Sequence, residues 1–133
     1  MSKMIFVNLP VHDLRKSTAF YEAVGGTQNP QFSDEASSCM VFSEAIYVML
    51  LTHDRYGTFT QRPIADVHKT SAALLALTVE DRPMVDSIVD RAAAAGGLAD
   101  PNPKQDHGFM YGRSYEDPDG NVWEIIWMAP AAS

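Results

Sequence analysis

The 133-residue chain has the length of one compact domain, and 46% of its residues are hydrophobic while 20% are charged. This composition supports a buried core and excludes a disordered polypeptide. The formal net charge of −7 repels phosphate backbones and anionic lipids, so we expect neither nucleic acid nor membrane as a partner. No apolar run reaches the roughly 18 residues that span a bilayer, and Met1–Leu9 lacks a signal-peptide pattern, which favours a cytoplasmic protein.

The first half of the chain predicts a strand, a helix and three further strands. An apolar run over residues 4–9 precedes Asp13, whose carboxylate is suited to cap the first turn of a helix. Gly25 and Gly26 then end that helix, because glycine adopts positive φ without strain. Short β-type runs follow at residues 31–34, 38–42 and 46–52. This half therefore predicts a βαβββ module over residues 1–54.

The second half repeats the plan after a polar linker over residues 55–70. Residues 74–79 predict a strand, Asp81 a helix start, and the Gly96-Gly97 pair a helix end. The helix carries an apolar stripe at the spacing of one face, formed by Val85, Ile88, Val89 and Ala92. Prolines at 101 and 103 interrupt strand pairing before a final hairpin over residues 109–116 and 121–128. Residues 71–133 thus form a second module, and the two modules make a single domain.

The register of the final hairpin depends on its turn. Asp117-Pro118-Asp119-Gly120 predicts a type I turn followed by a left-handed glycine, which is a three-residue loop. In that register the opposing pairs are Ser114 with Glu124, Gly112 with Ile126, and Met110 with Met128. A loop with an even number of residues would instead place Arg113 opposite Glu124 as a salt bridge.

The chain resembles the vicinal oxygen chelate superfamily, which includes glyoxalase I, bleomycin-resistance proteins, fosfomycin-resistance enzymes and extradiol dioxygenases. The resemblance is carried by Val11-His12-Asp13-Leu14, by Phe20-Tyr21, and above all by Asp117-Pro118-Asp119-Gly120-Asn121-Val122-Trp123-Glu124. It implies an α+β fold in which two βαβββ modules form cupped mixed sheets, the glyoxalase-like fold, commonly completed by a homodimer.

Metal-bearing members of this superfamily hold a divalent ion with side chains from the first and fourth strands of each module. The resemblance places these four positions at Phe6, Leu50, Leu74 and Glu124. Only Glu124 offers a donor atom, and a divalent ion needs three or more ligands to displace its water. We therefore expect no metal centre and no cofactor.

Glu124 is the main candidate functional residue, because a carboxylate is costly to bury unpaired in an apolar strand. It is expected either to face a cavity as hydrogen-bond acceptor or general base, or to be a former ligand satisfied by a neighbouring side chain. His107, beside the last hairpin, is a weaker candidate acid or base. His12, His53 and His68 show no motif spacing and receive no role. The expected ligand-binding residues are Phe6, Asn8, Leu50, Leu74, Met110, Gly112, Ser114 and Glu124.

Two functions fit these observations. The first is a metal-free binding protein of the glyoxalase and bleomycin-resistance type, which holds an apolar or aromatic metabolite or antibiotic in a sheet-lined cavity. The second is a glyoxalase-like lyase, isomerase or dioxygenase that uses an atypical metal site or Glu124 as general base. The sequence leaves open whether the protein is an enzyme and which small molecule it takes.

Overall fold

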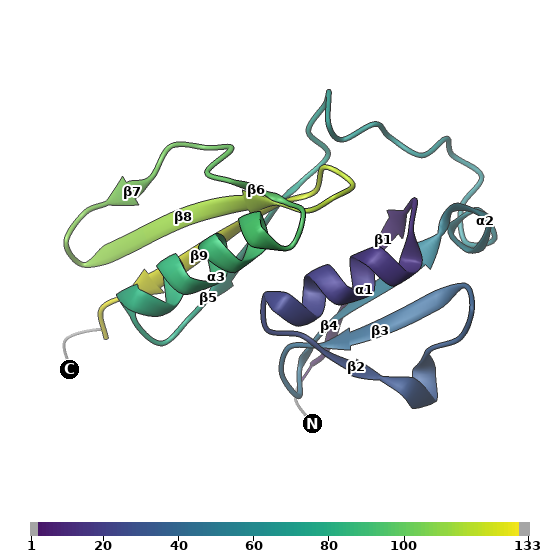
Figure 1. Cartoon of the computed structure of the whole chain (residues 1–133), viewed down its shortest axis with the longest axis horizontal. Helices are drawn as coiled ribbons and strands as arrows, with labels where there is room; N and C mark the ends of the chain where they lie inside the picture. Colours follow the sequence, from purple (N-terminus) through teal and green to yellow (C-terminus); the bar gives the residue numbers. More distant parts are fainter. Residues whose placement is uncertain (1–2, 131–133) are drawn as a thin grey trace. The chain divides into compact units, whose positions relative to one another are not determined.

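The computed structural model describes residues 3–130 and divides the chain into two compact units, Met1–Ala65 and Asp66–Ser133 (Figure 1). Each unit contains one mixed sheet and one long helix, so the α+β class predicted from sequence is confirmed. The boundary between the units falls inside the predicted linker over residues 55–70. Within residues 3–130, no helix combines the length and apolar character needed to cross a membrane.

The first unit contains a four-stranded sheet in the order β1-β4-β3-β2. Strands β1 and β4 run parallel, and the other neighbours run antiparallel. Its elements are β1 (Ile5–Val11), α1 (Leu14–Ala23), β2 (Thr27–Asn29), the 3-10 helix η1 (Pro30–Phe32), β3 (Ser37–Val41), β4 (Ile46–Thr52) and α2 (His53–Tyr56).

The chain enters and leaves α1 as the sequence predicts. Asp13 accepts a 3.0 Å hydrogen bond from the backbone N–H of Lys16, and Gly25 follows the helix with φ +113°. Phe20 and Tyr21 on α1 are fully buried, and α1 packs on β3 and β4. The sheet residues that are also completely buried include Val11, Met40, Val48 and Leu50.

The prediction of a strand at residues 31–34 is wrong. The strand after α1 is β2, and it pairs with β3 so that Asn29 opposes Cys39. The chain then turns into η1 because the Asn29 side chain accepts a 3.0 Å bond from Gln31 N, and Pro30 supplies the fixed φ of a first helical residue. Local capping therefore ends the strand earlier than the apolar pattern indicated.

The second unit contains a five-stranded sheet in which β5, β9, β8 and β6 follow in order and β7 also pairs with β8. Its elements are β5 (Leu74–Thr78), α3 (Arg82–Ala94), β6 (Leu98–Ala99), β7 (Gln105–Asp106), β8 (Met110–Glu116) and β9 (Val122–Met128). Strands β5 and β9 are parallel, and the remaining pairs are antiparallel.

Helix α3 begins and packs as its sequence predicts. Asp81 accepts a 2.8 Å bond from Met84 N at the start of the helix, and Pro83 occupies the first turn. The residues of the apolar stripe, Val85, Ile88, Val89 and Ala92, are all buried. Because α3 contacts β8 and β9, it covers one face of this sheet and leaves the other face for a site (Figure 1).

Candidate functional site

The hairpin of β8 and β9 has the three-residue loop that the turn sequence predicts. Asp117 N donates to Asn121 O at 2.8 Å, and Gly120 has φ +97°. Ser114 pairs with Glu124, Gly112 with Ile126, and Met110 with Met128. The alternative salt bridge between Arg113 and Glu124 is wrong, because Arg113 pairs with Ile125 and its side chain binds α3.

The two faces of the second sheet can be assigned from these pairs. Arg113 reaches Asp86 and Asp90 on α3, so the odd-numbered residues of β8 face that helix. The even-numbered residues face away from it, on what we call the open face of the second sheet. Its members are Leu74, Ala76, Thr78, Met110, Gly112, Ser114, Glu116, Val122, Glu124, Ile126 and Met128.

Glu124 lies on this open face within a small polar cluster. Its side chain is half-buried, and its Oε1 accepts a 3.0 Å hydrogen bond from Nδ2 of Asn102. Asn102 also donates its backbone N–H to Oγ of Ser114 at 3.0 Å. Ser114 is fully buried beneath this contact. Glu124, Asn102 and Ser114 thus form one hydrogen-bonded group drawn from three segments of the unit.

Asn102 was not identified from the sequence, although its setting carried a signal. It lies between Pro101 and Pro103 in the segment Asp100–Pro103, which we call the strap. The strap connects β6 to β7, both of which pair with β8, so the chain leaves the edge of the sheet and returns to it. The prolines on both sides of this asparagine have no backbone N–H to donate to a neighbouring strand, so the segment cannot pair as a regular strand. The polar groups of the asparagine must therefore find other hydrogen-bond partners.

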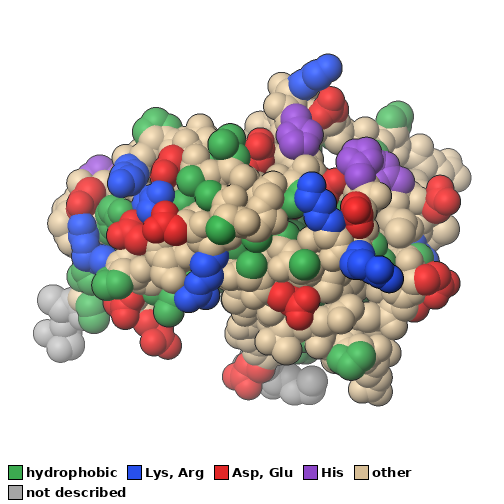
Figure 2. Space-filling model, in the orientation of Figure 1, with side chains coloured by type: hydrophobic (Ala, Val, Ile, Leu, Met, Phe, Trp, Pro, Cys, Tyr) green, Lys and Arg blue, Asp and Glu red, His purple; other side chains and the backbone are tan. Residues whose placement is uncertain are grey.

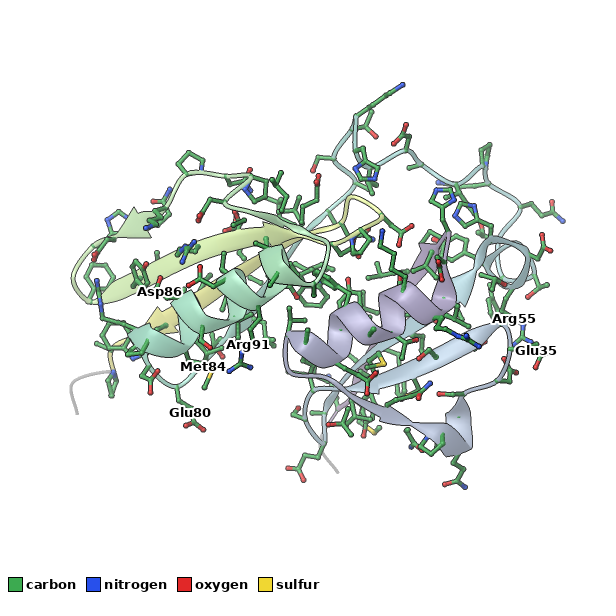
Figure 3. The ribbon with its side chains drawn as sticks, in the orientation of Figure 1. Glu35, Arg55, Glu80, Met84, Asp86 and Arg91 are labelled. Carbon is green, nitrogen blue, oxygen red and sulfur yellow. The ribbon has the colours of Figure 1, made fainter. Side chains whose placement is uncertain are left out.

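A dense ion-pair network lies on the opposite, helix-covered face. Arg113 is only 8% exposed and binds Asp100 through Nε at 3.0 Å and through Nη2 at 2.7 Å. Its Nη1 lies 2.9 Å from Asp86 Oδ1 and 3.4 Å from Asp90 Oδ1. Figure 2 shows acidic and basic side chains gathered over this part of the unit, and in Figure 3 Asp86 points from α3 toward β8.

These contacts shift the protonation equilibria of the network. The hydrogen bonds from Arg113 lower the pKa of Asp100 below its usual value, and the hydroxyl of Tyr111, 2.6 Å from Asp86, lowers the pKa of Asp86. Burial, together with that same bond to Asp86, raises the pKa of Tyr111. The bonds to Asp100 raise the pKa of Arg113 further, so the guanidinium remains charged at any physiological pH. The network is therefore ionised and structural at neutral pH.

The first unit places the predicted residues Phe6 and Asn8 on the face away from α1. Phe6 is 47% exposed and stacks on Tyr47 with ring centroids 4.5 Å apart, and Asn8 is exposed. Asn8 pairs with Met49, just as Ala76 pairs with Glu124 in the second unit. Asn8 and Ala76 occupy equivalent positions in the two units, because each lies five residues before the N-cap aspartate of its helix. Their partners on the neighbouring strand are therefore also equivalent, so Met49 is the counterpart of Glu124.

The placement of Leu50 corrects the sequence alignment by one residue. Leu50 pairs with Leu9 and Ser38, and Ser38 bonds to Thr18 of α1 at 2.9 Å. Leu50 is completely buried and thus belongs to the core under α1. Because neighbouring residues of a strand point to opposite faces, Leu50 cannot share the face of Phe6.

The remaining predicted positions lie on the open face of the second sheet but differ in surroundings. Leu74 is 58% exposed, Met110 is half-buried, and Gly112 is buried. A Cβ added at Gly112 would meet Ile126 Cγ1 at 3.5 Å, which is ordinary van der Waals contact. His107 is exposed, and its ring contacts the side chain of Gln105. Its backbone N–H donates to the carbonyl of Met110. Met110 lies about 13 Å from Ser114 along β8, because the two are four residues apart on a strand. The structure therefore does not bring His107 to Glu124.

His12 and His53 form a pair that sequence reasoning missed. Val11 pairs with Thr52 in the parallel strands β1 and β4, so the next residue of each strand falls side by side. The two imidazole rings have centroids 4.3 Å apart and border an open depression of about 340 Å³ with Val11, Thr52 and Asp54. The parallel pairing of β1 with β4 would have indicated this pair of histidines. A search for short sequence motifs could not find it, because the two residues are far apart in the sequence.

The metal site of the superfamily does not fit these side chains. Phe6 and Leu74 have no donor atoms, Leu50 is in the core, and Met49 offers only a soft thioether. Glu124 is the single carboxylate at the four positions, and its Oε1 is bonded to Asn102. Within residues 3–130, no three His, Cys, Asp or Glu side chains are grouped so that they could hold a metal ion. No chemistry is therefore assigned to a bound metal.

The match to a family model covers most of the chain. Residues 3–125 match the model of the Glyoxalase/Bleomycin resistance protein/Dioxygenase superfamily. The chain belongs to this superfamily, and the predicted resemblance to vicinal oxygen chelate proteins is confirmed. A comparison with curated proteins gave no match.

Solved structures support the same fold. A hypothetical protein, SA1046 from S. aureus, is 24% identical with a TM-score of 0.77, covering 96% of this chain and 94% of that one. A glyoxalase/bleomycin resistance protein/dioxygenase family enzyme from Burkholderia phytofirmans PsJN is 20% identical with a TM-score of 0.74, covering 96% and 99%. The fosfomycin resistance protein FosX from Listeria monocytogenes is 18% identical with a TM-score of 0.67, covering 100% and 94%. At these identities the likeness concerns the fold.

Proposed function

We propose that this chain is a small-molecule-binding protein that uses no metal and holds an apolar or aromatic ligand on the open face of the second sheet. The observation that carries the proposal is the setting of Glu124. Its carboxylate is half-buried among apolar residues of β5 and β9 and accepts one bond from Asn102. No cationic side chain among residues 3–130 lies within ion-pair distance of it.

Such a carboxylate favours a ligand that donates a hydrogen bond. The Oε1 atom is oriented by Asn102, and a carboxylate has acceptor capacity for further donors. Ala76, Val122 and Ile126 surround Glu124 with apolar surface that an aromatic or aliphatic body can cover. The net charge of −7 disfavours an anionic ligand. The ligand class is therefore an apolar molecule with an amine or hydroxyl head.

We propose further that the protein is a cytoplasmic homodimer. Strands β1 and β5 are the outer strands of their sheets, and Leu74, Met128 and Phe6 are about half-exposed on the sheet faces opposite the long helices α3 and α1. Exposed apolar sheet faces and free strand edges favour association with a second copy. Light scattering at micromolar concentration should give twice the 14.6 kDa chain mass, and a monomer mass would count against the dimer.

The binding proposal is tested with three probes that share one aromatic body. We expect 2-phenylethylamine and 2-phenylethanol to bind in ligand-observed NMR, and 3-phenylpropionate to bind more weakly or not at all. Glu124→Gln keeps the shape of the side chain but removes its charge, so affinity for the amine should fall by roughly one to two kcal/mol. Glu116→Gln is the matched control, because Glu116 lies on the same face at the end of β8. Equal effects of the two variants would refute the role of Glu124.

A further inference from the structure

The strap is held from both faces of the sheet by two consecutive residues of β8. Arg113, on the helix-covered face, binds the carboxylate of Asp100 through two parallel bonds of 3.0 and 2.7 Å. Ser114, on the open face, accepts a 3.0 Å bond from Asn102 N through its hydroxyl and a 2.8 Å bond from Asp100 N through its carbonyl. The strap therefore crosses from one face to the other within three residues.

That crossing requires an unfavourable backbone conformation at Asp100. Its φ is +56°, and it is the one non-glycine residue among residues 3–130 with positive φ. Aspartate tolerates the left-handed region better than most residues, but the conformation still needs support from its surroundings. The bidentate contact with Arg113 supplies this support, since a planar guanidinium fixes both carboxylate oxygens at once.

The strap has few other anchors. Pro101 and Pro103 lack backbone N–H donors, so the strap donates main-chain hydrogen bonds to β8 only through Asp100 and Asn102. Arg113 is itself immobilised, because it is 8% exposed and also paired with Asp86 and Asp90 of α3. The strap is thus held by a fixed guanidinium on the face opposite to Glu124 and by the Ser114 hydroxyl on the face of Glu124.

We propose that Arg113 and Asp100 are a positioning pair for the binding site. They hold the strap in the conformation that places the side-chain amide of Asn102 on Oε1 of Glu124, and they act across the sheet without touching the ligand. The effect of this pair on ligand affinity rests on the proposed function, because the orientation of Glu124 matters for affinity only when Glu124 binds the ligand. The placement of Asn102 can be measured with no ligand present.

The first test measures the side-chain amide signals of Asn102 by ¹⁵N NMR in the full chain. In the wild type we expect the two N–H proton resonances to be split more widely than those of a solvated amide, because the proton donated to Glu124 is shifted downfield. Asp100→Gly keeps the left-handed backbone without strain but removes the contact with Arg113, and it should move these signals to those of a freely solvated amide. Arg113→Lys keeps the positive charge but loses the planar guanidinium that binds both carboxylate oxygens, and it should move the Asn102 signals in the same direction.

Asp90→Asn is the matched control. Asp90 belongs to the same Arg113 network but lies on α3 with a 71% exposed side chain, and among residues 3–130 its ion pair is with Arg113 and not with the strap. The Asn102 signals should be unchanged in this variant while those of α3 change locally. Unchanged Asn102 signals in folded Asp100→Gly, or equal changes in Asp100→Gly and Asp90→Asn, would overturn the proposal.

The second test measures affinity for 2-phenylethylamine. Loss of the oriented Asn102 contact should weaken binding about five- to tenfold in Asp100→Gly, with no change in Asp90→Asn. If the wild type does not bind this probe, the proposed function fails for this ligand class, while the Asn102 signals still decide the positioning role. Moved Asn102 signals with unchanged probe affinity would confine the pair to holding the strap and would overturn its role in the site.

Discussion

Asn102 donates a 3.0 Å hydrogen bond from its side-chain amide to Oε1 of Glu124, although the two residues lie far apart in the sequence. Asn102→Ala should therefore lower the free energy of unfolding by about 1 kcal/mol, because a hydrogen bond to a charged group is lost at a partly buried position. Urea unfolding measures this change. Asn8→Ala is the control, since Asn8 is exposed and its side-chain amide donates to the carbonyl of Phe6 two residues away, and its effect should stay within about 0.5 kcal/mol. Equal effects would show that the Asn102 contact contributes nothing.

Gly112 tests whether the ligand occupies the open face. A side chain there would project beside Ile126 at ordinary contact distance, and Gly112 does not need positive φ. Gly112→Val should thus keep the melting temperature or raise it by a few degrees, because valine favours strands, while it lowers affinity for 2-phenylethylamine at least about tenfold. Thermal melting and ligand-observed NMR provide the two readings. A stable variant with normal affinity would place the ligand elsewhere.

Leu50 and Phe6 test the corrected register of the first sheet. Leu50 is completely buried beneath α1, so Leu50→Ala should destabilise the fold by about 3 kcal/mol through cavity formation. Phe6 is 47% exposed and stacks on Tyr47, so Phe6→Ala should cost less than about 1 kcal/mol. Chemical denaturation compares the two variants. A larger cost for Phe6→Ala would reverse the assignment of the two faces.

The Arg113 network predicts how stability depends on pH. Asp100 and Asp86 have pKa values lowered from the usual 3.8 by the bonds from Arg113 and Tyr111. A carboxylate with a lowered pKa stabilises the fold above its unfolded value, and this contribution is lost as the pH falls through the folded value. Stability should therefore decrease below about pH 4, and Asp100→Asn should show a shallower decrease. Urea midpoints between pH 6 and about pH 2.5 measure both profiles, and parallel profiles would contradict the assignment.

Local patterns in the sequence were sufficient for much of the fold. Asp13 and Asp81 predicted the starts of the two long helices, α1 and α3, because N-cap chemistry acts within one turn. The Asp117–Gly120 turn predicted the register that places Ser114 opposite Glu124, since loop length fixes which residues face each other.

Features that depend on tertiary contacts were missed or misplaced. The alignment of β4 was wrong by one residue, because Val48, Met49, Leu50 and Leu51 are all apolar and give no alternation to read. Asn102 and the pair of His12 and His53 arise where segments distant in sequence meet, so no local spacing indicates them. One alternative placed Arg113 opposite Glu124, whereas its side chain lies on the other face and binds Asp86 of α3.

The most direct test of the binding site is a ¹H–¹⁵N NMR titration of the full chain with 2-phenylethylamine, in the wild type and in Glu124→Gln. The proposed function predicts saturable shifts centred on Ala76, Asn102, Ser114 and Ile126, the residues around Glu124. In Glu124→Gln the same residues should shift at a probe concentration roughly five- to thirtyfold higher. Shifts confined to other parts of the chain, or the same affinity in both proteins, would contradict the claim that the Glu124 face is the binding site.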